Sequence, residues 1–143
     1  MDIRQITDTY AVSPQISPED LPAIKAAGFT RIIANRPDGE NPPELQVAAI
    51  QAAAEALGLE FIVNPVIGGA ITMDNVNAQG DAISGATGPV LAYCASGNRS
   101  SIVWAMSQAG ERPTDELVEL PARHGYRMDI WRDQIDALAA SKG

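Results

Sequence analysis

The sequence predicts an α/β fold in which helices flank a mostly parallel sheet in three layers. Short apolar runs of strand length occur at 29–35, 59–64 and 90–93, and a segment with helical apolar spacing follows each of them. Strands that alternate with helices in this way are joined by right-handed crossovers, which make the strands parallel. The 143 residues are enough for one core of this kind, so we expect a single domain, 1–143.

The first half of the chain carries clear start and stop signals for its elements. Residues 3–6 and 9–13 predict two short strands, either a hairpin or two edge strands. Ser17, a proline and two acidic residues together begin a helix, and Gly28 ends it. After the first interior strand, a turn rich in Pro and Gly leads into a second helix, whose apolar residues keep helical spacing over 43–57.

The second half continues the alternation and then becomes helical. A loop with two glycines follows the second interior strand, and Thr72 begins a helix that ends near Gly85. The last strand leads into a helix over 100–109. Two further helices are predicted at 114–123 and 128–140, because Thr caps the first and an amphipathic pattern runs through the second.

The only cysteine, Cys94, lies where the last strand meets its helix. Unpaired N–H groups and the dipole at a helix N-terminus favour an anion, so they stabilise the nucleophilic thiolate. Arg99 adds a positive charge, and Gly97 lets the backbone curl with its N–H groups inward. The alternative is a buried structural cysteine before a glycine turn. We predict a nucleophile in an anion-binding loop whose binding residues are Ala95, Ser96, Gly97 and Asn98.

This loop resembles the active loops of two families, the cysteine-dependent phosphatases and the rhodanese-like sulfurtransferases. Phosphatases carry Cys-x5-Arg with Gly three residues after the Cys. Gly97 fits that pattern, but Arg99 comes one residue early and Ser100 stands in its place. Many rhodaneses carry Cys-x-x-Gly-x-Arg-Ser, which this loop matches from Cys94 to Ser100.

The chain as a whole resembles the phosphatase-like domain of β-lactamase-hydrolase-like proteins over roughly residues 1–110. The resemblance implies a dual-specificity-phosphatase-like fold. It also implies an activity described in different members as phosphatase or sulfurtransferase, with some members fused to a metallo-β-lactamase-like domain. The segments that carry the resemblance are 12–16, 35–40, 65–66 with 70–72, and 89–94 with Gly97 and Arg99.

Ligands in parallel sheets bind beyond the carboxyl ends of the strands, so three separate segments should meet in one crevice. There Arg36 is a candidate for binding a substrate anion, and Asp38 for donating a proton. The alternative is that Asp38 serves the turn and Glu40 is solvated. Ser100 would donate its hydroxyl to the Cys94 thiolate, or cap the helix. The three strand ends are residues 35–36, 64–65 and 93–94.

Composition narrows the classes of partner. A net charge of −8 argues against nucleic acids and anionic membranes. One cysteine and one histidine exclude an internal disulfide and a cluster of metal ligands, so we expect a cytoplasmic protein without metal or cofactor. The expected substrate is a small anionic or persulfide molecule, with a protein sulfur donor or acceptor as a further partner.

The spacing of the loop favours sulfur transfer over phosphoryl transfer. Four residues separate Cys94 from Arg99, which makes a cradle better sized for the sulfur of a persulfide than for a tetrahedral phosphate. The predicted function is therefore sulfane-sulfur transfer, with hydrolysis of phosphate monoesters as the alternative. A module that binds an anion or a partner without turnover is a third possibility. The predicted catalytic set is Cys94, Arg99, Ser100 and Asp38.

Overall fold

The computed structural model describes residues 2–142 and has a five-stranded sheet in the order β1-β2-β5-β3-β4. β1 (Arg4–Gln5) is antiparallel to β2 (Tyr10–Ser13). The other neighbours are parallel and include β3 (Arg31–Ala34), β4 (Glu60–Val63) and, in the centre, β5 (Val90–Tyr93). The mostly parallel sheet is confirmed. The N-terminal hairpin is also present, but β2 is an interior strand because it pairs with β1 on one side and with β5 on the other.

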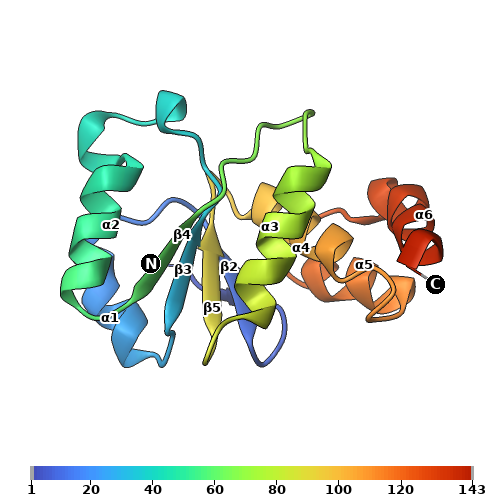
Figure 1. Ribbon diagram of the computed structural model, residues 1–143, viewed down its shortest axis with the longest axis horizontal. Coiled ribbons are helices and arrows are strands. Elements are labelled where there is room, and N and C mark those ends of the chain that lie inside the picture. Colours follow the sequence, from blue (N-terminus) through green and yellow to red (C-terminus); the bar gives the residue numbers. More distant parts are fainter. Residues whose placement is uncertain (1, 143) are drawn as a thin grey trace.

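Helices cover both faces of the sheet, as Figure 1 shows. α1 (Leu21–Ala26) and α2 (Val47–Ala56) lie on one face, over a buried apolar cluster that includes Ile32 and Leu91. α3 (Met73–Ser84) and α4 (Asn98–Ser107) lie on the other, over a second cluster. The three-layer arrangement predicted from the sequence is therefore confirmed.

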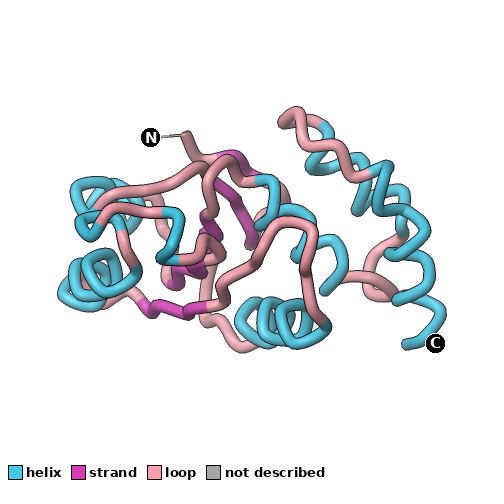
Figure 2. Tube along the Cα trace, turned by 90° about the horizontal axis from the view of Figure 1, so that it is seen from above, coloured by secondary structure: helices cyan, strands magenta, loops and turns pink. Residues whose placement is uncertain are grey.

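Two C-terminal helices, α5 (Thr114–Ala122) and α6 (Arg132–Lys142), pack on the far side of α4 rather than on the sheet (Figures 1 and 2). As a result α4 is enclosed between the sheet and these helices, and its residues from Ser100 to Ser107 are all buried. A helix buried all round needs no polar face. Within residues 2–142, no helix has both the length and the apolar character needed to cross a bilayer.

The carboxyl ends of the strands place three segments side by side. Cys94 follows β5, Asn35 follows β3 and Asn64 follows β4. Backbone hydrogen bonds extend the ladder beyond the strands, since Asn35 N donates to Tyr93 O at 2.9 Å and Asn64 N donates to Ala34 O at 2.9 Å. The predicted crevice is therefore where the polar residues of these three segments meet.

Candidate active site

Cys94 is fully buried at the junction between β5 and α4. The Gly97 N–H donates to its Sγ at 3.1 Å. Gly97 has φ of 95°, a left-handed conformation that favours glycine, and α4 begins directly after it at Asn98. The helix starts two residues earlier than the sequence pattern predicted, which brings its positive N-terminal end close to the thiol.

The loop carbonyl oxygens accept hydrogen bonds from neighbouring elements. Ala95 O accepts from Gln15 N at 3.4 Å. Ser96 O accepts from the Tyr126 hydroxyl at 2.7 Å, and Gly97 O accepts from the Ser101 hydroxyl at 2.8 Å. Carbonyl dipoles that are engaged elsewhere do not compete for the centre of the loop, so amide N–H groups are the loop's contribution to an anion there.

Arg99 is held by two partners beside the thiol. Its Nη1 and Nη2 donate to the two carboxylate oxygens of Glu40 at 2.8 and 2.7 Å, and Nη1 also donates to Val66 O at 2.9 Å. The hydrogen bonds to Glu40 are the main cause that raises the pKa of Arg99 above its ordinary value, and its interaction with Cys94 adds to it. Arg99 is therefore held near Cys94 although it comes one residue early in the sequence.

Arg99 retains one edge for a ligand. A guanidinium has five N–H donors in a planar fork. Glu40 takes two of them and Val66 O takes a third. The remaining two, on Nε and Nη2, lie along the side edge of the fork, and no oxygen or nitrogen acceptor among residues 2–142 binds them. This edge has the geometry that matches two oxygens of one phosphate.

Arg36 reaches the same carboxylate as Arg99. Its Nε donates to Glu40 Oε1 at 3.2 Å and its Nη1 donates to Gln15 Oε1 at 3.4 Å. The two arginines hold the pKa of Glu40 below its usual range, with Arg99 as the main cause. The structure thus brings Arg36 and the Cys94 loop together through Glu40.

Asp38 and Ser100 have other partners than the sequence predicted. A carboxylate oxygen of Asp38 accepts from Val47 N at 2.8 Å and so caps the first turn of α2. The Ser100 hydroxyl is buried and donates to Asn35 Oδ1 at 2.9 Å, not to the thiol. Ser100 lies two residues inside α4, which turns its side chain toward the strand ends rather than toward Cys94. In this structure both side chains are engaged by partners other than the thiol.

A buried polar network lies beneath the site. The Gln79 side chain accepts from the amides of Asn35 and Asn64, each at 2.9 Å, and donates to the Tyr10 hydroxyl at 3.0 Å. Asn35 also fixes Val66, whose N–H donates to Asn35 O at 2.8 Å. The network therefore positions the carbonyl of Val66 that binds Arg99. The sequence showed Asn35 and Asn64 at strand ends but gave no signal for Gln79, which lies in the middle of a helix.

Two more residues at the loop were not identifiable from the sequence. Arg4 donates to the Tyr126 hydroxyl at 2.5 Å, and its guanidinium lies 5.3 Å from the centre of the Tyr126 ring. A Cβ on Gly97 would overlap the Tyr126 hydroxyl. Tyr126 follows α5 and therefore holds the loop from the C-terminal helical region.

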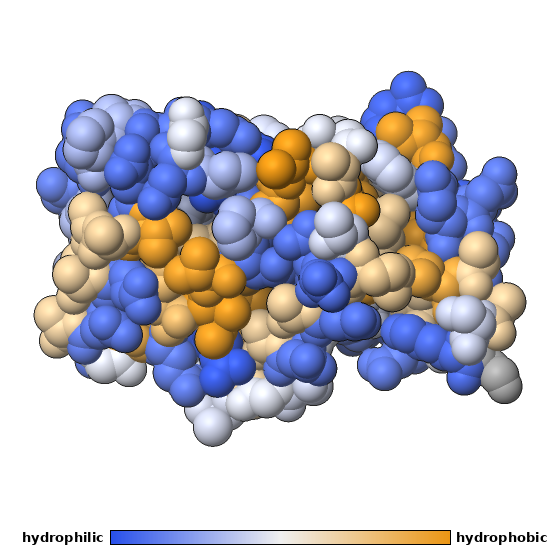
Figure 3. Space-filling view, turned by 45° about the horizontal axis from the view of Figure 1, so that its top comes forward, coloured by the Kyte–Doolittle hydropathy of each residue, from blue (hydrophilic) through white to orange (hydrophobic). Residues whose placement is uncertain are grey.

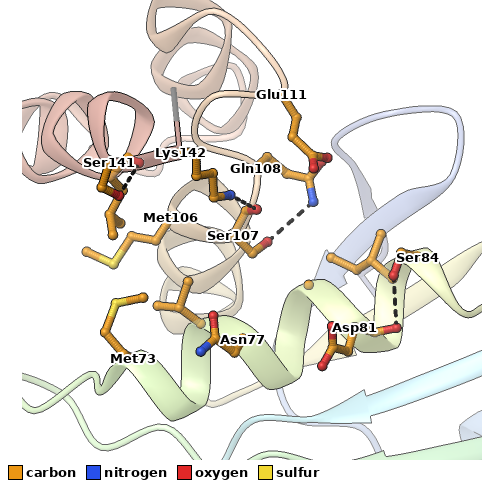
Figure 4. A pocket seen from close by; sticks show the side chains of 14 residues that line it. Met73, Asn77, Asp81, Ser84, Met106, Ser107, Gln108, Glu111, Ser141 and Lys142 are labelled. Atoms are coloured by element: carbon orange, nitrogen blue, oxygen red, sulfur yellow. Dashed lines mark hydrogen bonds between the residues drawn. The ribbon is translucent and has the colours of Figure 1, made fainter.

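A pocket of about 670 Å³ opens elsewhere, between α3, α4 and α6 (Figure 4). Met73, Met106 and Lys142 are among its lining residues, and none of the lining residues belongs to the Cys94 loop. Within residues 2–142, no group of three or more His, Cys, Asp or Glu side chains is arranged to hold a metal ion. The loop at the strand ends is therefore the site with the clearest chemistry.

Comparisons with known proteins identify the family to which this chain belongs. The family model of the "Beta-lactamase hydrolase-like protein, phosphatase-like domain" matches residues 2–111. A beta-lactamase hydrolase-like protein of Xylella fastidiosa is 36% identical over 128 residues, which are 88% of this chain and 30% of the relative. The chain thus spans less than a third of that relative's length.

Solved structures give the same picture of the fold. The crystal structure of a candidate phosphatase from Neisseria meningitidis has a TM-score of 0.83 and 31% identity, over 96% of this chain and 99% of that one. P. aeruginosa TpbA, in complex with phosphotyrosine, has a TM-score of 0.68 and 15% identity, over 97% of this chain and 88% of that one. The cysteine-phosphatase-like fold is confirmed, and the chain belongs to the family of phosphatase-like domains found in beta-lactamase hydrolase-like proteins.

Proposed function

We propose that this protein hydrolyses phosphate monoesters through a covalent intermediate on Cys94. The observation that carries the proposal is the edge of Arg99 formed by Nε and Nη2, which Glu40 and Val66 leave open beside the thiol. The early position of Arg99 in the sequence favoured sulfur transfer. Its side chain is held by Glu40 and by Val66 O beside the strand ends, which supports phosphoryl transfer despite this spacing.

The reaction follows from the placement of these groups. The Cys94 thiolate attacks phosphorus, the bond from phosphorus to the ester oxygen breaks, and its electron pair leaves with that oxygen. The loop N–H groups and the Arg99 edge bind the equatorial oxygens, where charge accumulates in the transition state. Water then attacks the cysteinyl phosphate, releases inorganic phosphate and returns the electron pair to the sulfur.

The family and its neighbours support this choice over sulfur transfer. The matched family is described as phosphatase-like, and the N. meningitidis relative is a candidate phosphatase that covers nearly the whole chain. TpbA, which shares the fold, binds phosphotyrosine in its crystal structure. An aryl phosphate is therefore the first substrate to test.

The test is turnover of p-nitrophenyl phosphate by the wild type and by Cys94→Ser. Loss of the nucleophile should lower kcat by about a thousandfold or more. Acid quench of the wild type during turnover should trap one phosphoryl group on the peptide that contains Cys94. Thermal unfolding of the variant is the control for its folding. Equal turnover in both proteins would contradict the proposal.

Sulfur transfer is a second candidate, because the loop matches the spacing Cys-x-x-Gly-x-Arg-Ser from Cys94 to Ser100. A terminal persulfide sulfur is a single anionic atom, and the Gly97 N–H that donates to Sγ shows that a loop donor reaches the sulfur position. Incubation with thiosulfate or a small persulfide would add one sulfur atom to Cys94, visible by intact mass and reversed by cyanide. This adduct, without phosphatase turnover, would select the second candidate.

A further inference from the structure

None of the groups described above serves as a general acid when the leaving group departs. When the bond to phosphorus breaks, the ester oxygen takes the electron pair and becomes an alkoxide or a phenoxide. A basic alkoxide leaves well only if a positioned acid protonates it, and such an acid contributes about 10²–10⁴-fold. A weakly basic phenoxide leaves without help. The presence of an acid therefore decides which esters the protein can cleave.

The segment after β4 lies beside the Cys94 loop and contains no acidic residue. Val66 O accepts from Arg99, so this segment lies beside the position of a bound phosphate. From residue 64 to 72 it reads Asn, Pro, Val, Ile, Gly, Gly, Ala, Ile and Thr, none of which has a side chain that titrates in the ordinary range. Its one large exposed side chain is apolar, since Ile67 is 60% exposed.

The segment after β3 has two carboxylates, and both are engaged. Glu40 binds Arg99 through both of its oxygens, and the two arginines around it keep it ionised. Asp38 is engaged at the start of α2, where its Oδ1 accepts from Val47 N at 2.8 Å. Glu40, held in its ionised form by two arginines, has no proton to give. The carboxylate of Asp38 is occupied at the start of α2 rather than at the Cys94 loop.

Resting on the proposed function, we infer that the leaving group departs from this site as an anion that receives no proton from the protein. The substrates are then phosphate monoesters of acidic hydroxyl compounds, such as phenols, and not esters of ordinary alcohols. Ile67 supplies an apolar contact for such a leaving group, and apolar surface is exposed at this end of the molecule (Figure 3).

The balance of the step is simple. The Cys94 sulfur forms a bond to phosphorus, and the bond from phosphorus to the phenol oxygen breaks with its electrons on that oxygen. The phenoxide takes its proton from solvent after release. Neither phosphorus nor sulfur changes oxidation state, and only water is needed to free the phosphate from Cys94 in the second half of the reaction.

The test is kcat/KM for a series of aryl phosphates whose phenols differ in acidity, together with glycerol phosphate. This constant reports the first chemical step, in which the leaving group departs. It should fall by about three- to tenfold for each pKa unit of the phenol, because a loose transition state places charge on the leaving oxygen. Glycerol phosphate should be cleaved at least about a thousandfold more slowly than the most reactive aryl ester.

Two variants separate this inference from a hidden acid. Asp38→Asn keeps a helix-capping side chain, and Asp74→Asn removes the exposed carboxylate in the first turn of α3. In both variants kcat/KM should fall with the pKa of the phenol as steeply as it does in the wild type. If kcat/KM of the wild type hardly changes with the pKa of the phenol but falls steeply with it in one variant, the substituted residue is the acid and the inference is wrong. A kcat/KM that hardly changes with this pKa in all three proteins would also overturn the inference. Absence of any phosphate release or cysteinyl phosphate would overturn the proposed function itself, and this inference with it.

Discussion

The Tyr126 hydroxyl lies 2.7 Å from the carbonyl oxygen of Ser96, and this single bond ties the C-terminal helical region to the loop of the nucleophile. The two residues are 30 positions apart in the chain. Arg4 completes the arrangement by donating to the same hydroxyl. The Tyr126 oxygen therefore joins three separate parts of the molecule at the rim of the site.

Removal of that hydroxyl should reduce activity more than stability. In Tyr126→Phe the ring still fills its place, but Ser96 O keeps only the long bond from Arg4 Nη1, at 3.5 Å, and the loop loses its short anchor. We expect kcat to fall by roughly tenfold and the free energy of unfolding to fall by only about 1 kcal/mol. Aryl phosphate turnover and urea unfolding measure the two effects. A large loss of stability with unchanged kcat would show that the bond serves only the fold.

A side chain at residue 97 should disrupt the loop by two mechanisms. Gly97→Ala forces alanine into a left-handed conformation, which costs about 1–2 kcal/mol, and places its Cβ against the Tyr126 hydroxyl. Gly28→Ala is the matched control, because Gly28 also has a positive φ but open space around it, and it lies between α1 and the start of β3. Both variants should lose stability by urea unfolding, and only Gly97→Ala should lose most of its turnover. Equal turnover in the two would contradict the contact with Tyr126.

Breaking the pair between Glu40 and Arg99 should weaken the binding of phosphate. Glu40→Gln keeps one acceptor but removes the charge that holds the guanidinium in place. We expect kcat/KM to fall by about ten- to a hundredfold. Inhibition by inorganic phosphate measures the binding component directly. Unchanged phosphate affinity would mean that Arg99 keeps its position without Glu40.

The same pair makes part of the stability depend on pH. Because the pKa of Glu40 is lower in the folded protein than in the unfolded chain, ionised Glu40 stabilises the fold at neutral pH. That contribution is lost as pH falls through the folded pKa, below the usual range of a carboxyl. The stability difference between wild type and Glu40→Gln should therefore be present at pH 7 and disappear in strong acid. Urea unfolding across this range would reveal a constant difference if the pair had no such effect.

The buried network should be costly to interrupt. Gln79→Leu leaves the amides of Asn35 and Asn64 without their shared acceptor, so we expect a loss of about 2–3 kcal/mol in the free energy of unfolding. Asn77→Leu, at an exposed position on the same helix, is the control and should change stability by less than about 0.5 kcal/mol. Similar losses in both would indicate an effect on helix α3 rather than on the network.

Local sequence patterns were sufficient to predict the helices, the strands and the Cys94 loop. They were not sufficient to predict which residues far apart in the sequence bind one another. The junction at Cys94 could be predicted because an apolar strand, a glycine and a helix start are contiguous in sequence. The partner of Arg99 could not, because Glu40 is 59 residues away and any of several acids had the same chemistry. Asp38 and Ser100 were assigned to catalysis from their residue types. Their hydrogen bonds to Val47 N and Asn35 depend on how the elements pack.

The position of β5 has a consequence for the order of folding. β5 is the last strand in the chain, yet it lies between β2 and β3 in the middle of the sheet. Before it inserts, the hairpin of β1 and β2 and the pair of β3 and β4 are two separate pieces without a shared edge. Such non-local pairing forms slowly because the entropy of a long loop is lost before the contacts are gained. Cys94 directly follows β5, so the nucleophile is set in place by the same event that joins the two halves of the sheet, and a half-folded chain has no assembled site.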